Sequence, residues 1–153
     1  MSEREIISQL RRRITPELYR QIRQEWKVHS IAEDQRDIAG LMSTLTEDCV
    51  YELVNTGAKW HGKEGATRFY TDLLSAFPDI HFDLQNVVIG PQGVFEEAHV
   101  TATHTGDWQE YKATGQLVEF EVIILFPWNM EKEKFSGERM YTFGLDALVQ
   151  ESS

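Results

Sequence analysis

Two long β-type runs that follow one another closely constrain the fold of this chain most. Apolar and polar residues alternate from Val94 to Thr105, and the run Val118–Trp128 follows after a short polar loop that begins at Gly106. Alternation with a period of two residues is typical of a strand with one buried face. Two such strands so near in sequence are expected to pair antiparallel, because a short loop cannot make a parallel crossover.

Helical patterns come mostly before these strands. Residues 1–14 are expected to form a helical arm, with a short helix over Met1–Arg13. Thr15-Pro16-Glu17 predicts a helix start, with threonine as the N-cap and proline at the first helical position. The other predicted elements are helices over Ile38–Leu45 and Lys63–Phe77, strands over Cys49–Val54, His81–Ile89 and Phe135–Phe143, and a short tail over Leu145–Gln150.

This order of elements predicts the fold class. Helix, helix, strand, helix and then four strands indicate an α+β domain over residues 15–153 with a mainly antiparallel sheet. Long strands with one aromatic-rich face predict a sheet that curls over the helices and leaves a cavity at its mouth.

Composition limits the partners and the setting. The chain has 153 residues, is 41% hydrophobic and carries a net charge of −10, which disfavours nucleic acid and anionic membranes as partners. Its single cysteine, Cys49, excludes an intrachain disulfide and is expected to be a small core residue. A cytoplasmic location is expected, since no run approaches the ~20 apolar residues of a membrane span and the N-terminus lacks the apolar core of a signal peptide.

Ionisable residues within the apolar strands are the first candidates for chemistry. His104 lies near a strand end, and a neutral imidazole can take or give a proton near neutral pH. Glu121 lies among apolar residues and would be a second acid or base if it faces the cavity. Both residues could instead lie outside the sheet, His104 bonded to a neighbouring strand and Glu121 as a surface charge.

Further residues are predicted to contact a ligand. Glu138 and Arg139 point to opposite faces of their strand, so one of them should reach the interior, although an outer Arg–Glu pair is the alternative. Tyr141 shares the face of Arg139 and could donate a hydrogen bond to a carbonyl oxygen. The other predicted contacts are His29, which continues an apolar helical stripe, and the aromatic wall residues Tyr51, Trp60 and Tyr70. No spacing typical of a metal site or a phosphate-binding loop occurs.

Several motifs, in this order, resemble the SnoaL-like polyketide cyclases, which belong to the superfamily named after nuclear transport factor two. The motifs are Trp60-His61-Gly62, Ala76-Phe77-Pro78-Asp79-Ile80, Thr103-His104-Thr105-Gly106 and Gly137-Glu138-Arg139. The resemblance implies a cone-shaped α+β barrel in which three helices pack on a curved sheet around an internal cavity. It also implies ring closure by an aldol step that uses acid–base residues and no cofactor or metal, and a homodimer formed through the sheet.

The sequence departs from the family at one position that matters for catalysis. The family places an acidic residue shortly before its Leu-Leu-x-Gln tail, here Leu148-Val149-Gln150, and that position falls on Phe143 or Gly144. The nearest carboxylate is Asp146. Alignment with the ketosteroid isomerases of the same superfamily places His29 at their oxyanion-binding tyrosine and Leu53 at their aspartate base, which argues against that mechanism.

Three functional hypotheses therefore remain open. The first is a cofactor-free cyclase or isomerase that binds an apolar, carbonyl-bearing ligand and uses His104 and Glu121. The second is a non-catalytic ligand-binding or assembly module of the same fold, because the family's acid is absent. The third is a hydrolase of the epoxide type, which needs paired acids and an arginine around a water molecule.

Overall fold

The computed structural model describes residues 1–144, and its strands form one open six-stranded sheet. The elements in chain order are α1 (Glu3–Arg11), α2 (Pro16–Asp34), α3 (Ile38–Met42), β1 (Leu45–Leu53), β2 (Ala58–His61), α4 (Gly62–Ala76), β3 (His81–Gly90), β4 (Gly93–Thr103), β5 (Leu117–Asn129) and β6 (Lys134–Phe143). The predicted tail over Leu145–Gln150, with Asp146, lies outside the described residues.

The sheet has the strand order β2-β1-β6-β5-β4-β3. The pair β1–β6 is parallel, and every other neighbouring pair is antiparallel. The pairing of β4 with β5 is the longest and confirms the predicted hairpin. Register shifts in β1–β6, β3–β4 and β5–β6 add local twist, which bends the sheet around the helices.

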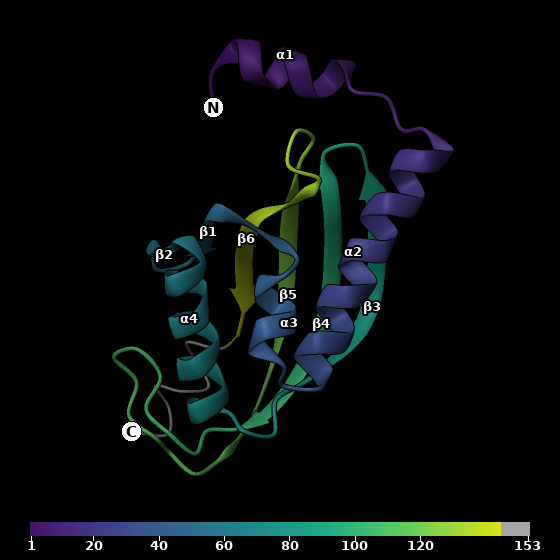
Figure 1. Cartoon of the computed structure of the whole chain (residues 1–153). Helices are drawn as coiled ribbons and strands as arrows, with labels where there is room; N and C mark the ends of the chain where they lie inside the picture. The colour runs from purple at the N-terminus through teal and green to yellow at the C-terminus, as the bar shows by residue number, and fades with distance from the viewer. Residues whose placement is uncertain (145–153) are drawn as a thin grey trace.

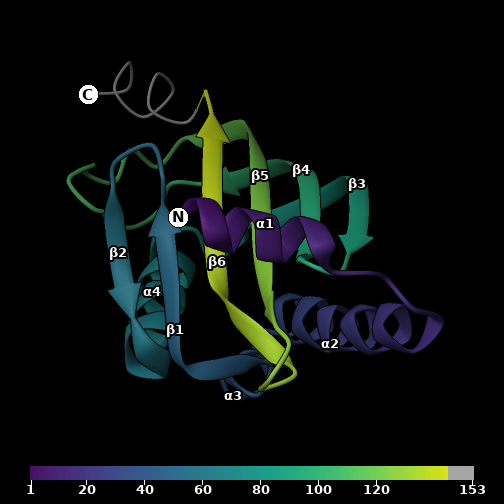
Figure 2. The ribbon, with the colours of Figure 1, turned by 90° about the horizontal axis from the view of Figure 1, so that it is seen from above.

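Helices α2, α3 and α4 cover one face of the sheet, called here the inner face, and α1 lies apart from this layer (Figure 1). Seen from above, α1 crosses over the opposite, outer face near β5 and β6 (Figure 2). The inner face contributes every second residue of β4 to the core, and Cys49 of β1 is buried there as predicted. None of the helices in residues 1–144 is long and apolar enough to span a membrane.

The predicted α+β class, the three covering helices and the curved, mainly antiparallel sheet are confirmed, with two differences in detail. The predicted helix Ile38–Leu45 ends at Met42, and β1 begins at Leu45 rather than at Cys49. Residues Ala58–His61 form a short edge strand, β2, that the turn residues before it obscured. The sheet is mixed, because β1 pairs parallel with β6. It is also open, because β2 and β3 are its two edge strands.

Gly137 sets the course of β6 at the register shift beside β1. Its φ is +124°, and a Cβ atom there would lie 1.9 Å from the carbonyl oxygen of Val50. We expect Gly137→Ala to lower the free energy of unfolding by about 3 kcal/mol or more, because the variant must strain its backbone and push β1 away. Urea denaturation measures this, with Gly115→Ala as the control for an alanine at positive φ without a close contact, because its φ is +69° and nothing lies within 4 Å. Equal losses in both variants would show that close packing against Val50 is unimportant.

Candidate active site

Helix α2 presents polar side chains to the inner face in the middle of an apolar stripe. Thr15 caps the helix, and Ile22, Trp26 and His29 follow one another at helical spacing. His29 is buried, and Glu33, four residues further on, lies on the same side of the helix. One helix face therefore carries an imidazole and a carboxylate toward the sheet.

Strand β6 supplies the second carboxylate. Glu138 is buried on the inner face, where it lies beside Tyr51 of β1, whereas Arg139 points to the outer face. Of the two residues that the sequence left open, Glu138 is thus the one that reaches the interior.

These side chains form one buried hydrogen-bonded network. The Oε1 atom of Glu138 lies 2.9 Å from His29 Nε2 and accepts a hydrogen bond of 2.9 Å from the Tyr70 hydroxyl. The hydroxyls of Tyr51 and Tyr70 are 3.0 Å apart. On the far side of the imidazole, His29 Nδ1 lies 2.8 Å from Thr44 Oγ1. The network satisfies polar groups that would be costly to bury alone.

The direction of these bonds follows from the Thr44 hydroxyl. It donates its only proton to the carbonyl oxygen of Leu41 at 2.7 Å, so it accepts from His29 Nδ1–H. The Nε2 atom of His29 therefore faces Glu138 with one proton held between them. Both the His29 contact and the Tyr70 hydrogen bond are made by Glu138 Oε1, so Oε2 is the carboxylate oxygen left to meet a ligand.

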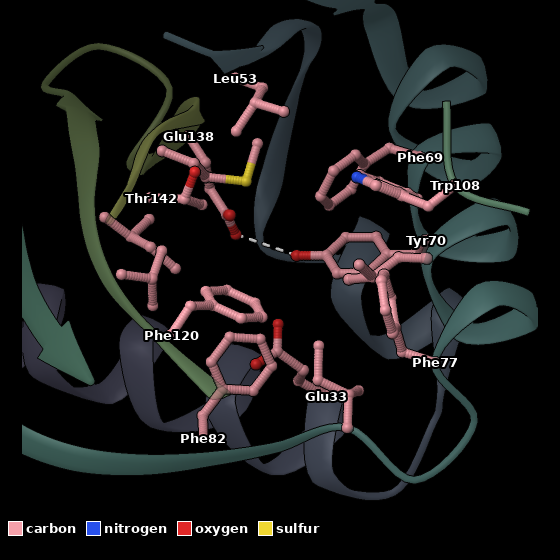
Figure 3. A pocket seen from close by; sticks show the side chains of 15 residues that line it. Glu33, Leu53, Phe69, Tyr70, Phe77, Phe82, Trp108, Phe120, Glu138 and Thr142 are labelled. Carbon is pink, nitrogen blue, oxygen red and sulfur yellow. Dashed lines mark hydrogen bonds between the residues drawn. The ribbon is translucent and has the colours of Figure 1, made fainter. Parts of the chain in front are cut away.

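The network forms part of the wall of a pocket on the inner face of the sheet. Figure 3 shows Glu138, Tyr70 and Glu33 directed into this pocket. The remaining wall is apolar except for Thr142, and its aromatic part comes from Phe69, Phe77, Phe82, Trp108 and Phe120. Among the described residues that line it there is no lysine or arginine.

Burial and nearby negative charge favour the neutral forms of two tyrosines and one glutamic acid in and beside the pocket. Burial, followed by the negative charge of Glu138, raises the pKa values of Tyr51 and Tyr70 well above normal, so both stay hydrogen-bond donors. Burial and then Glu138 also raise the pKa of Glu33 well above its usual value. Glu33 and Glu138 offer oxygens within 4.8 Å of each other, and two carboxylates this close do not both ionise readily.

Glu96 of β4 lies behind the network, in a small cavity between α2 and the sheet. It is buried and accepts a hydrogen bond of 3.1 Å from Trp26 Nε1. Burial, and next the charge of Glu138, raises the pKa of Glu96 to about 7. Glu96 is therefore protonated and uncharged in mild acid and becomes negatively charged only near neutral pH.

This raised pKa makes stability depend on pH. The folded chain holds the Glu96 proton more tightly than the unfolded chain, so the free energy of unfolding falls as pH rises from about 4.5 to about 7, by about 3 kcal/mol for this group. Glu96→Gln keeps an oxygen for Trp26 and cannot ionise. We expect it to be more stable than the wild type at pH 8 and to show a flatter profile in urea denaturation. Glu97→Gln, on the outer face, is the control, and identical profiles for Glu96→Gln and the wild type would contradict the prediction.

The structure brings three of the predicted site residues together in the network, and among these three Tyr70 lines the pocket. His29, Tyr51 and Tyr70 belong to the network. Trp60 packs edge-on against Phe69, with ring centroids 5.0 Å apart, and so supports the wall from behind.

Glu121 requires a correction. The strand alternation of β5 places it on the outer face, half exposed, where it pairs with His99 of β4. Arg139 and Tyr141 also lie on the outer face, where Arg139 is 3.9 Å from Glu52 Oε2. The expectation that these three side chains reach the cavity is wrong, because their parity along the strands is the opposite one.

His104 is fully buried but does not line the pocket. Its ring stacks on Phe77 at 5.2 Å between centroids, which puts Phe77 between the imidazole and the ligand space. Burial lowers the pKa of His104, which favours the neutral ring. Its Nδ1 lies 3.3 Å from Thr114 Oγ1, and its Nε2 has no partner within the described part of the chain.

Sequence reasoning missed Glu33 and Glu96 and left open which of Glu138 and Arg139 points inward. Glu33 continues the spacing of Ile22, Trp26 and His29, and Glu96 alternates with the apolar residues Val94 and Ala98. In both cases the periodicity of the helix or strand indicates the inward direction, because a charged residue at the same spacing as the buried residues must lie on the same face.

His29, Glu33 and Glu138 could also hold a divalent cation. Each offers one ligand atom, and these atoms lie within 4.8 Å of one another. One nitrogen with two carboxylate oxygens is a donor set that zinc accepts. The spacing of these residues along the sequence gives no sign of the cluster, because its members come from α2 and from β6, more than 100 residues apart in the chain.

Comparison with known protein families identifies the family to which this chain belongs. A family model described as SnoaL-like polyketide cyclase matches residues 17–137. No curated protein matches this chain significantly.

Solved structures share the fold at low sequence identity. A proposed SnoaL-like polyketide cyclase from Jannaschia sp. CCS1 superposes with a TM-score of 0.75 at 17% identity, covering 93% of this chain and 98% of that one. AclR, a proposed hydroxylase from Streptomyces galilaeus, gives 0.68 at 18% identity over 86% and 96% of the two chains. A protein like nuclear transport factor two, of unknown function, from Burkholderia pseudomallei gives 0.68 at 10% identity over 84% and 95%.

Proposed function

Because this chain belongs to the SnoaL-like polyketide cyclase family, we propose that it binds an apolar, carbonyl-bearing small molecule and transfers protons at the carbon beside the carbonyl group. Such a transfer starts both an aldol ring closure and an isomerisation, and it needs neither metal nor organic cofactor. The observation that carries the proposal is the pair of carboxylates, Glu138 and Glu33, within 4.8 Å of each other in an aromatic pocket.

The two carboxylates take different roles. Glu138, held by His29 and Tyr70, is the base: its Oε2 removes a proton from the carbon, and the electron pair of that C–H bond moves toward the carbonyl oxygen. Glu33, kept protonated by its raised pKa, donates a proton to that oxygen and forms the enol. The enol carbon then attacks a second carbonyl, whose oxygen takes the proton held by Glu138, while the enol hydroxyl returns its proton to Glu33 and becomes a carbonyl again. In an isomerisation, Glu138 instead returns its proton to another carbon of the conjugated ligand, and the enol hydroxyl again returns its proton to Glu33.

His29 and Tyr70 act as positioning residues for the base. Thr44 fixes the orientation of the imidazole, so that His29 Nε2 always faces Glu138. The Tyr70 hydroxyl donates to the same oxygen, which leaves Oε2 as the atom directed at the ligand. A preorganised base of this kind loses little free energy to reorientation during the reaction.

The charge of the pocket narrows the ligand class. Two carboxylates and no cationic side chain among its described lining residues disfavour phosphates and carboxylic acids. Phe69, Phe77 and Trp108 provide flat apolar walls instead. The ligand is therefore an uncharged, partly aromatic ketone or aldehyde.

Deuterium exchange tests the function without knowledge of the natural substrate. Proton NMR in D₂O follows the loss of the protons beside the carbonyl of an aromatic ketone such as 2-tetralone. We expect the wild-type protein to accelerate exchange, and to do so equally with and without EDTA. If a panel of such ketones binds without accelerated exchange, proton transfer is ruled out for this class. Loss of exchange with EDTA would instead assign His29, Glu33 and Glu138 to a metal ion.

A binding module without catalysis is the second candidate function. Its support is the position that the family resemblance makes acidic, because Phe143 is exposed on β6 and Gly144 has no side chain. In this case the carboxylates would only accept hydrogen bonds from a ligand. The epoxide-type hydrolase is less well supported, because Arg139 lies on the outer face and cannot join the paired acids.

A further inference from the structure

Helix α1 is well formed but contributes nothing to the core of its own chain. Ser2 and Glu5 make a capping box at its start, yet none of its nine residues is buried. Isolated helices of fewer than ~12 residues are marginal in water even with good caps. A helix this short therefore needs a surface to pack against.

The apolar side of α1 points away from its own sheet. Met1, Gln9 and Arg12 line the groove between the arm and the outer face, whereas Ile6 and Leu10 lie on the other side of the helix. Ile6 is 46% exposed and Leu10 is 76% exposed. In cis, Gln92 Nε2 donates a hydrogen bond of 3.0 Å to the Gln9 carbonyl oxygen, and this bond holds the polar side of α1 toward the sheet.

The outer face of the sheet has uncovered apolar side chains of its own. Val88, Phe95 and Leu125, on three consecutive strands, are 59%, 37% and 36% exposed. Directly paired strand residues share a face, and the pairs Val88–Phe95 and Phe95–Leu125 make these three a continuous row. The groove beneath α1 opens beside this row at Leu125.

The charges of the two surfaces are complementary. Residues 1–14 contain four arginines and two glutamates, although the whole chain has a net charge of −10. The outer face carries Glu97, Glu119 and Glu121 on β4 and β5. A basic arm that carries an amphipathic helix and a partly apolar sheet face with these glutamates attract each other, which speeds and orients association.

We propose that the apolar side of α1 docks on the outer sheet face of a second copy of this chain, in a dimer in which the two arms are exchanged. The arm lies before the residues that match the family model. A second copy is the fitting partner because both complementary surfaces belong to one chain. In a dimer with a two-fold axis, the contact between arm and sheet face then occurs twice.

Analytical ultracentrifugation of the full chain tests the proposal. We expect the wild type to be a dimer at micromolar concentration and Leu10→Glu to weaken dimerisation by at least about tenfold. Glutamate keeps a good helix propensity, and Leu10 packs on nothing in its own chain, so the variant should still fold. Ile31→Glu on α2, at a site 52% exposed, is the matched control and should dimerise like the wild type.

Two results would overturn the proposal. One is a wild type that sediments as a single chain up to about 100 micromolar. The other is a dimer that Leu125→Glu disrupts and Leu10→Glu leaves unchanged, because the sheet would then pair without the arm. Neither result bears on the exchange of ketone protons, since Leu10 and Leu125 lie outside the pocket.

Cross-linking shows directly that the arm crosses to the partner. Leu10→Cys chains labelled with ¹⁵N are mixed with unlabelled Leu125→Cys chains and treated with a short bis-maleimide, while the native Cys49 is buried and unreactive. We expect a two-chain product that contains one chain of each kind. The pair Ile31→Cys and Leu125→Cys is the control, and an equal yield from both pairs would contradict arm exchange.

Discussion

Glu138→Gln is expected to slow deuterium exchange of the bound ketone by about 10² to 10⁴-fold, the usual contribution of a positioned general base. The amide cannot take up the proton that Oε2 of the carboxylate removes. Binding of the ketone should change little, because the amide is isosteric and the aromatic wall of Phe69, Phe77 and Trp108 is untouched. NMR exchange rates and a separate binding titration measure the two effects independently.

The fold of this variant should survive. The amide has the shape of the carboxylate and its oxygen still accepts a hydrogen bond from the Tyr70 hydroxyl, so the packing around it is kept. Glu121→Gln is the matched control, since it removes a carboxylate from the other His–Glu pair, on the outer face. Exchange that continues at the wild-type rate in Glu138→Gln would eliminate Glu138 as the base.

Periodicity in the sequence was sufficient for the fold but not for every side-chain direction. The alternation from Val94 to Thr105 correctly separates the inner residues of β4 from the outer ones, because both faces differ clearly in polarity. The corresponding pattern in β5 is less clear, since Ile123 and Leu125 make the outer face apolar as well. For this reason Glu121 looked like an interior carboxylate when it is an exterior one.

The site itself depends on contacts that no local pattern contains. His29 and Glu138 are 109 residues apart, and the parallel pairing of β1 with β6 sets Glu138 beside Tyr51. That pairing requires the close approach at Gly137, whose need for a positive φ is invisible in the sequence. The inward direction of His29 was predictable from its helical spacing, but the identity of its partner was not.

Placement of His104 shows a different limit. The Thr103-His104-Thr105-Gly106 motif follows the family pattern, and the residue is buried as its neighbours suggest. Phe77 nevertheless stands between the ring and the pocket. A motif indicates that His104 lies at the end of its strand. Whether a ligand can reach the ring depends on Phe77, which follows α4 and packs over it.

His29→Leu is expected to lower the free energy of unfolding by about 3–5 kcal/mol, because it leaves the Glu138 charge buried without its partner. For a chain of this length, that corresponds to a melting temperature lower by roughly 6–20 °C. Calorimetry or a thermal melt followed by circular dichroism measures it. His99→Leu is the matched control, because it breaks the exposed pair with Glu121 and should cost no more than about 1 kcal/mol.

The double variant His29→Leu, Glu138→Leu separates loss of packing from loss of charge pairing. Two apolar side chains need no partner, so we expect the double variant to recover most of the stability that His29→Leu loses. The Tyr70 hydroxyl would still have the Tyr51 hydroxyl as a partner at 3.0 Å. If the double variant is as unstable as the sum of the two single variants, the buried pair is not coupled. The network would then be a set of independent contacts, and the positioning role proposed for His29 would lose its physical basis.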